Sequence, residues 1–317
     1  MTTNVQQKSG FSRWCAIVGR DLRVNKSIYA IAIPMILYYA IFQYAPMYGI
    51  TIAFKDYKPV KGIIDSAWVG LKHFDKFVSG VYFTRLIRNT FLLSFYSFIF
   101  GFPAPILLAL LLNEIQTSWF KRTVQTITYM PHFISMVVIC GMIKMFSQTE
   151  GILSDLMIFL TGGRLASTNL LISSKYFRSI YVISGIWQNI GWGSIIYLSA
   201  IASIDQAQYE SAVIDGAGRL AQAVYITIPG ISSTIIIRLI LRVGEIMNVG
   251  FEKVFLLYNE ATWSVSDVIS TYTYREGLVN FNYSYSTAVN LFNTLINLVF
   301  LLAANWISAR YSETSLF

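Results

Sequence analysis

The residues with the most specific chemical arrangement lie between positions 205 and 229. Asp205 is of a type that caps helix N-termini, and Gly216 suits the left-handed turn that ends a short helix. Between them the chain offers carboxylates to basic groups and small side chains that permit close approach. The members of this set are Tyr209, Glu210, Ser211, Ala212, Asp215, Gly216 and Ala217, followed by Pro229, which suits the start of the next helix. The pattern predicts a short helix that docks in a groove of another protein; a solvated connector is the alternative.

A second set of polar residues lies inside apolar stretches, where an unsatisfied polar or charged group is costly. Asn290, Asn293 and Asn297 fall on one helical face, and Arg242 and Glu245 are close enough in sequence to pair. Such groups must face protein or a water-filled cavity. Interhelical hydrogen bonds and an ion pair explain single members, whereas the set as a whole is also consistent with a polar path. The path candidates are Gln188, Asn189, Trp192, Asn290, Asn293, Asn297, Arg242 and Glu245.

Enzymatic chemistry finds no support in the sequence. The chain has no Gly-x-x-x-x-Gly-Lys-Ser/Thr loop, so it cannot supply ATPase chemistry. His73 and His132 lack metal-ligand spacing, and Cys15 and Cys140 form neither a disulfide framework nor a metal site. No nucleophile is accompanied by a base. We therefore expect a chain that is not an enzyme on its own and that binds no metal or cofactor.

The composition places the chain in a membrane. Of 317 residues, 55% are hydrophobic and 13% charged, against about 25% charged in an ordinary soluble domain. One soluble core cannot hide so large an apolar surplus. The net charge of +8 is spread between apolar runs rather than in one stripe, which favours the positive-inside rule over nucleic-acid binding.

Six apolar stretches approach the roughly 17–25 residues that a membrane-spanning helix needs. They cover about 28–46, 90–112, 127–146, 179–201, 228–249 and 287–307. Pro103 and Pro105 predict a bend in the second stretch. We expect an all-α membrane protein with six transmembrane helices.

Lysine and arginine set the expected orientation. The basic residues before position 28 place the N-terminus in the cytoplasm, and six crossings return the C-terminus there. The loop of about 203–228 then also lies inside. The segment 55–88, which should lie outside, is nonetheless rich in lysine, although the charge rule weakens for long loops.

The expected domain organisation is simple. Residues 1–27 form a cytoplasmic tail, and the spacing of Phe11, Trp14, Val18 and Leu22 favours an amphipathic helix on the inner membrane surface over a frayed tail. Residues 28–310 form one membrane domain, and residues 311–317 form a C-terminal tail.

The docking loop resembles the EAA loop of ABC-importer permeases. That pattern is Glu-Ala-Ala, three residues, Gly, nine residues and Ile-x-Leu-Pro. Here it is Glu210-Ser-Ala, then Gly216, then Ile226-Thr-Ile-Pro, with every spacing matched. Ser211 for Ala and Ile228 for Leu are the only departures, and both conserve size.

The remaining chain is similar to the carbohydrate (type I, MalF/MalG-like) permeases, in the LplB/YtcP-like branch. The supporting runs are Ala45-Pro-Met-Tyr-Gly-Ile-Thr-Ile-Ala-Phe-Lys-Asp, Gln125-Thr-Ile-Thr-Tyr-Met-Pro-His-Phe-Ile-Ser, Asn248-Val-Gly-Phe-Glu-Lys-Val and Val268-Ile-Ser-Thr-Tyr-Thr-Tyr. The resemblance covers nearly the whole chain after Lys26.

This resemblance implies a type I ABC importer permease fold in the cell membrane, and a set of partners. A second homologous permease would pair with this chain, two ATPase subunits carrying ATP and Mg would bind the EAA helices, and an extracellular or periplasmic binding protein would deliver an oligosaccharide. The segment 258–283 would meet that binding protein. Arg242 and Glu245 would then either pair with each other, the favoured interpretation, or contact an acidic sugar.

A secondary transporter or channel without an ATPase is the alternative function. Such proteins often show inverted repeats and mid-membrane carboxylates, and neither is clear in this sequence. The identity, charge and length of the sugar do not follow from the sequence.

Overall fold

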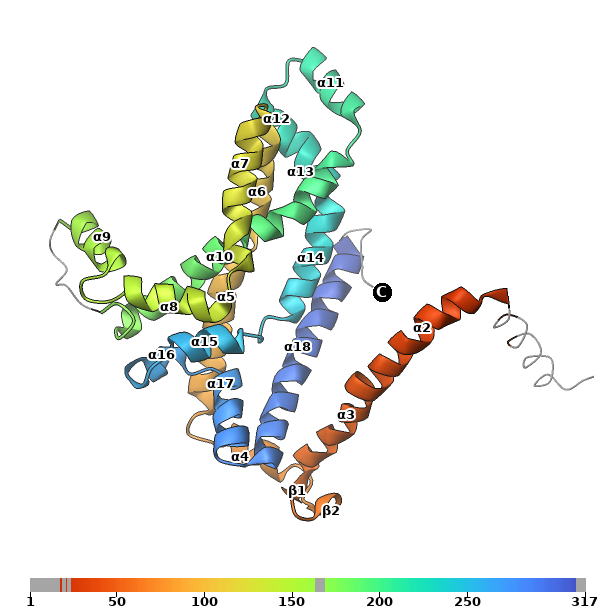
Figure 1. Cartoon of the computed structure of the whole chain (residues 1–317), viewed down its shortest axis with the longest axis vertical. Helices are drawn as coiled ribbons and strands as arrows, with labels where there is room; N and C mark the ends of the chain where they lie inside the picture. Colours follow the sequence, from red (N-terminus) through yellow and green to blue (C-terminus); the bar gives the residue numbers. More distant parts are fainter. Residues whose placement is uncertain (1–17, 19–20, 22–23, 163–168, 312–317) are drawn as a thin grey trace, which may run out of the picture.

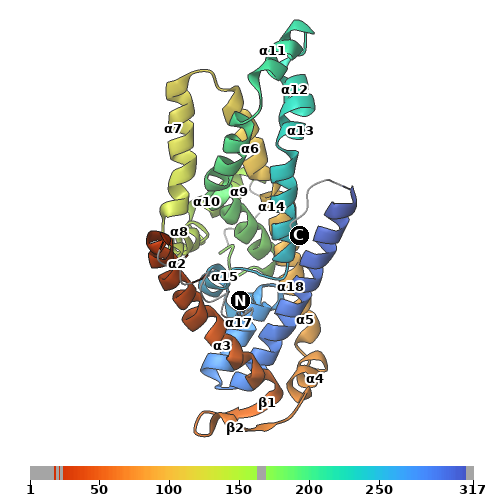
Figure 2. The same ribbon diagram turned by 90° about the vertical axis from the view of Figure 1, so that its right-hand side faces the viewer.

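The computed structural model describes residues 18, 21, 24–162 and 169–311. Within these ranges the chain is mostly helical, as expected, and it has one antiparallel hairpin of β1 (Lys55–Lys58) and β2 (Gly62–Trp68). The expected surface helix and the C-terminal tail lie largely outside the described residues. Figures 1 and 2 both place the hairpin at one end of the molecule and helix α11 (Gln206–Ile214) at the other.

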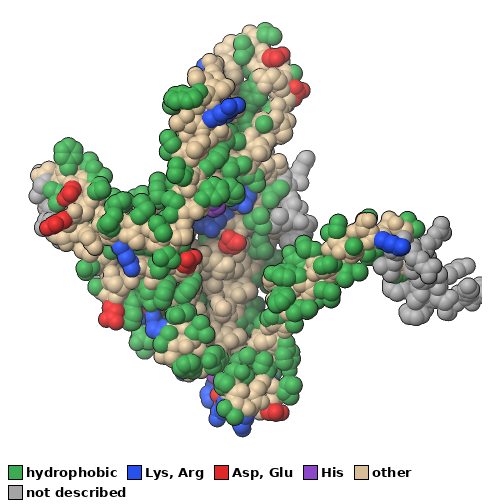
Figure 3. All heavy atoms as spheres, viewed as in Figure 1, with side chains coloured by type: hydrophobic (Ala, Val, Ile, Leu, Met, Phe, Trp, Pro, Cys, Tyr) green, Lys and Arg blue, Asp and Glu red, His purple; other side chains and the backbone are tan. Residues whose placement is uncertain are grey.

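The first expected span is longer than predicted. It is a helical run of 29 residues, Lys26–Phe54, made of α2 (Lys26–Tyr39), the π-helix η1 (Ala40–Tyr44), α3 (Ala45–Met47) and the 3-10 helix η2 (Tyr48–Phe54). No residue of its most apolar window is buried. Figure 1 shows α2 extending away from the other helices, and Figure 3 shows hydrophobic side chains over its visible face. This arm therefore offers its apolar surface to lipid or to another protein.

The second expected span follows α4 (Lys72–Val78) and also begins earlier than predicted. The run Phe83–Glu114 has 32 residues and consists of α5 (Phe83–Gly101) and α6 (Pro103–Glu114). The two helices join at Phe102, directly before Pro103, and Phe102 keeps helical backbone angles. The hydrogen-bond ladder is incomplete there, because a proline supplies no backbone N–H to the turn before it.

The third expected span is not straight. Helix α7 (Ser118–Tyr129) runs into the 3-10 turn η3 (Met130–Phe133), and α8 (Met136–Phe146) then leaves at 99°. Pro131 lies in the 3-10 turn, and Ser135 starts the new helix by accepting a bond from the amide of Val138. The sequence did not predict this break, because the residues on both sides of it are apolar. Helix α9 (Ile152–Leu160) follows.

The fourth expected span is α10 (Ser174–Ala202), and the fifth is again bent. The run Arg219–Gly230 contains α12 (Arg219–Gln222), the π-helix η4 (Ala223–Thr227) and α13 (Ile228–Gly230), and α14 (Ser232–Gly244) leaves it at 62°. It ends at Gly244, earlier than predicted.

The remaining elements are short helices and one long helix that corresponds to the sixth expected span. They are α15 (Phe251–Leu257), η5 (Glu260–Thr262), α16 (Trp263–Ser266), α17 (Ile269–Tyr274), the π-helix η6 (Arg275–Val279) and α18 (Tyr283–Tyr311).

By length and apolar composition, three helices in the described ranges can cross a membrane, or up to five if each bent pair is one crossing. The expected number of six is therefore not reached on these criteria. Helix α10 has 29 residues and is long enough, but glycines and polar residues such as Gln188 dilute its apolar stretch.

Buried Asp267 ties the short helices to the bundle. It is fully buried and pairs with Arg85 of α5 at 3.1 Å and with Arg275 of η6 at 2.9 Å. Asn89 of α5 adds hydrogen bonds to the carbonyls of Ser264 and Asp267. These satisfied buried charges fix the position of a segment that also supplies Val268, Ile269 and Tyr272 to the apolar core.

Candidate functional site

Helix α11 has the boundaries that its sequence predicts. The Asp205 carboxylate accepts a hydrogen bond from the Ala207 amide at 3.0 Å and caps the N-terminus. At the other end Gly216 has φ +77°, and the Ala217 amide donates to the Ala212 carbonyl at 2.8 Å. The positive φ explains why the chain has glycine at this turn.

Polar contacts tie α11 to the elements around it. The Tyr209 hydroxyl hydrogen-bonds the Thr227 hydroxyl at 2.9 Å, and Thr227 is buried at the end of η4. The side-chain amide of Gln222 donates to the carbonyl of Ala217, which follows α11, at 2.8 Å. Since η4 leads through α13 into α14, the Tyr209 contact joins α11 to the segment that precedes α14. Pro229 lies in the first turn of α13, as predicted.

The surface of α11 is largely exposed and partly apolar. Val213 is 62% exposed and Ile214 86%, and Glu210, Ser211 and Asp215 are also exposed. A hollow of about 690 Å³ lies beside the helix, lined in part by Glu114, Glu210 and Val213. Exposed apolar side chains next to carboxylates on a doubly capped helix fit a protein-docking surface.

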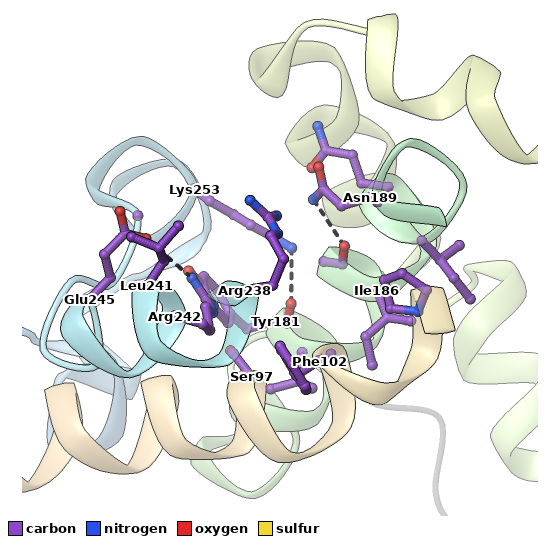
Figure 4. Close-up of a pocket in the computed structure, with 18 of the residues that line it drawn as sticks. Ser97, Phe102, Tyr181, Ile186, Asn189, Arg238, Leu241, Arg242, Glu245 and Lys253 are labelled. Carbon is purple, nitrogen blue, oxygen red and sulfur yellow. Dashed lines mark hydrogen bonds and ion pairs between the residues drawn. The ribbon is translucent and has the colours of Figure 1, made fainter. Parts of the chain in front are cut away.

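A second cavity, of about 510 Å³, is lined by residues of α5, α6, α8, α10, α14 and α15 and is called the α5–α15 cavity below. Of the path candidates, Gln188, Asn189, Arg242 and Glu245 line it. Figure 4 shows that Asn189 and Arg242 approach the cavity from helices far apart in sequence. The volume is within the range of about 300–1,000 Å³ that is usual for ligand sites.

The cavity contains more basic than acidic groups. Arg238, Arg242 and Lys253 line it together with Glu245. Arg242 and Glu245 form the predicted pair, with 3.9 Å between Nη1 and Oε2. Lys253 is 5% exposed, and its ammonium donates to the Tyr181 carbonyl at 2.9 Å and lies 4.7 Å from the centre of the Tyr181 ring.

Gln188 is the most deeply buried of the polar path candidates in this cavity. It is 5% exposed, and within the described part of the chain its Oε1 atom has no hydrogen-bond partner. A buried acceptor without a donor is costly. The side chain lies at the wall of the cavity.

Trp192 lies away from this cavity. Its ring stacks on His132 with 4.7 Å between the centroids and an interplanar angle of 3°. His132 also contacts the Asn189 side chain at 3.1 Å. His132, for which the sequence showed no partner, therefore connects η3 to α10. A role of Trp192 in the path stays a prediction.

The asparagine stripe of α18 makes helix-to-loop hydrogen bonds. The side chains of Asn293 and Asn297 both donate to the Asn248 side chain, at 3.3 and 3.0 Å, and Asn297 accepts from the Met247 amide at 2.8 Å. Asn290 is exposed. These contacts match the packing interpretation of the stripe, and its role in a path remains untested.

Sequence reasoning missed Lys253 and Tyr181. Lys253 occurs in the apolar run Phe-Glu-Lys-Val-Phe-Leu-Leu, where a lone cation signals either function or a buried partner. Its partner is a backbone carbonyl of a distant helix, which no sequence spacing can reveal.

Comparisons with known proteins agree with the docking loop and the helical fold. Residues 101–313 match the family described as "Binding-protein-dependent transport system inner membrane component". The protein LplB of Bacillus subtilis (strain 168) is 42% identical over 305 residues, which cover 96% of this chain and 94% of LplB. The polygalacturonan/rhamnogalacturonan transport system permease protein YteP of the same organism is 40% identical, covering 92% of this chain and 91% of YteP.

The fold also matches a solved transporter. A chain in the crystal structure of a bacterial ABC transporter involved in the import of the acidic polysaccharide alginate is 41% identical, with a TM-score of 0.83. The match covers 93% of this chain and 99% of that chain. A structure of the alginate transporter in complex with an alginate pentasaccharide-bound periplasmic protein matches with the same TM-score.

These matches confirm the resemblance drawn from the EAA spacing and the other sequence runs. They also confirm the expectation of a multi-pass membrane subunit that is not itself an enzyme. Because the family match covers residues 101–313 and relatives of 40% identity or more cover nearly the whole chain, this protein belongs to the permeases of binding-protein-dependent ABC importers, in which a separate subunit hydrolyses ATP.

Proposed function

We propose that this chain pairs with a second homologous permease to import an oligosaccharide, driven by two ATPase subunits that carry ATP and Mg. The names of relatives with 40–42% identity support a sugar cargo, since one transports polygalacturonan or rhamnogalacturonan and another imports alginate. The α5–α15 cavity is the proposed part of the sugar path in this chain, and its aromatic and amide side chains suit sugar rings and hydroxyls.

The proposed topology has six crossings with both termini in the cytoplasm. The three long apolar helices, the two bent pairs and α10 supply these crossings. The basic residues of the N-terminal tail support the orientation. The same proposal divides the chain into a tail of residues 1–27, a membrane domain of residues 28–310 and a tail of residues 311–317. It also gives a role in the sugar path to Trp192, Asn290, Asn293 and Asn297.

In this scheme α11 is the coupling helix. The observation that carries the proposal is a doubly capped helix with exposed Val213 and Ile214, tied by Tyr209 to Thr227 and so to the base of α14. Motion of an ATPase against α11 would shift α14, which carries Arg242 at the cavity. The binding protein would meet the opposite end of the molecule, where the segment 258–283 lies.

The experiment is transport by the reconstituted importer. The complex of both permeases and the ATPase is placed in vesicles with the binding protein and labelled oligosaccharide, and uptake is measured with ATP and with a non-hydrolysable analogue. We expect uptake only with ATP. Uptake with the analogue, or by the permease pair without the ATPase, would favour a secondary transporter or channel instead.

A further inference from the structure

The α5–α15 cavity has a charge pattern that a neutral cargo does not require. Arg238, Arg242 and Lys253 line it, and Glu245 is the single carboxylate among its described lining residues. Charged groups inside a membrane protein are costly and are retained mainly for function. An excess of cations at a cavity wall indicates an anionic ligand.

The four charged side chains differ in how strongly other groups of the protein hold them. Lys253 is buried and held by the Tyr181 carbonyl at 2.9 Å. Arg242 is half-exposed, and its 3.9 Å contact with Glu245 is too long for a strong hydrogen bond. Figure 4 shows Arg238 and Arg242 projecting from α14 toward the cavity that Lys253 reaches from α15. The Arg242 guanidinium can therefore engage a ligand without breaking a tight internal bond, whereas Arg238 also hydrogen-bonds the Tyr197 side chain.

Gln188 supplies a second, independent indication of a ligand. Its Oε1 atom is buried at the cavity wall without a donor in the described chain. A sugar hydroxyl is a donor of suitable size for this acceptor. Tyr181 and Tyr197 line the same space, and the Tyr181 ring lies beneath the Lys253 ammonium.

We propose that this cavity is a subsite for one carboxylate-bearing sugar residue, a uronate, of the transported oligosaccharide. The uronate carboxylate binds the guanidinium groups of Arg238 and Arg242 under the field of Lys253, and a ring hydroxyl donates to Gln188. Glu245 is the internal counter-ion: it holds Arg242 while the cavity is empty, and the cargo carboxylate replaces it. Arginine suits this exchange because its planar fork binds carboxylates in a bidentate manner. The inference rests on the proposed import function and adds the chemistry of the cargo.

The test uses the complete reconstituted importer and two cargoes. One is tetragalacturonate, and the other is the same tetramer with its carboxylates reduced to alcohols. Uptake of each is divided by the amount that the binding protein carries, so that the preference of the binding protein is removed. The variants are Arg242→Gln, its conservative partner Arg242→Lys, Glu245→Gln, and Arg310→Gln, which removes the same charge far from the cavity.

We expect wild type to prefer the acidic tetramer, and Arg242→Gln to lower acidic uptake about tenfold while sparing the reduced tetramer. Arg242→Lys recovers part of the preference, Glu245→Gln raises it, and Arg310→Gln leaves it unchanged. Equal uptake of both cargoes by wild type, or an equal loss of both in Arg242→Gln, overturns the subsite. A wild-type importer that takes up neither cargo contradicts the proposed import function instead.

Discussion

Single residues decide how α11 is shaped, and Gly216 is the clearest case. Its positive φ was predictable because a glycine after a short segment with an N-terminal capping residue is typical of a helix end. Lys253 was not predictable, since its burial depends on the Tyr181 carbonyl of a distant helix. Local conformational rules are thus visible in the sequence, whereas contacts between distant elements are not.

Replacing Gly216 with valine should impair transport. A β-branched residue at φ +77° costs roughly 1–2 kcal/mol, so the end of α11 would unwind or shift. ATP-dependent uptake should fall severalfold, while the amount of folded complex in the membrane is unchanged. Gly218→Val is the matched control, because Gly218 has φ −70° and open space around it. Equal uptake by both variants would mean that the turn at Gly216 does not matter for coupling.

At the scale of elements, hydropathy found the apolar stretches but not their geometry. The third expected stretch contains a bend of 99°, and a bend of 62° lies at the start of the fifth. The first bend coincides with Pro131 and the Ser135 cap, which together end one helix and start another. Apolar composition is continuous across such a break, so only the capping residues could have marked it.

The Asp267 network should hold the short helices α16 and α17 against α5. In Asp267→Asn, Arg85 and Arg275 lose their shared counter-charge. Removing one partner of a fully buried pair costs about 3–5 kcal/mol, and the cost is smaller here because the arginines are 33% and 24% exposed. The purified complex should unfold at a lower temperature, measured by loss of folded protein on heating. The exposed Asp65→Asn on β2 is the control, and the same unfolding temperature for both variants would contradict the role of the network.

At the scale of the whole molecule, the docking helix α11 and the cavity are separate regions that the chain from η4 to α14 joins. The cavity is bounded by α14, and α14 begins next to the segment that Tyr209 ties to α11. The family and the docking loop were recognisable from the sequence because the EAA spacing is local. The cavity was recognisable only in part, because its walls come from six helices that only the fold brings together.

The central claim is that a separate ATPase acts on this permease through α11. A photo-crosslinking residue at Val213, which is 62% exposed on α11, tests it in the assembled importer. The same probe at Val60, fully exposed in the hairpin at the opposite end, is the control. We predict that the Val213 probe crosslinks to the ATPase subunit and the Val60 probe does not. Crosslinking of the ATPase from Val60, or none from Val213 in a complex that still transports, would contradict the account.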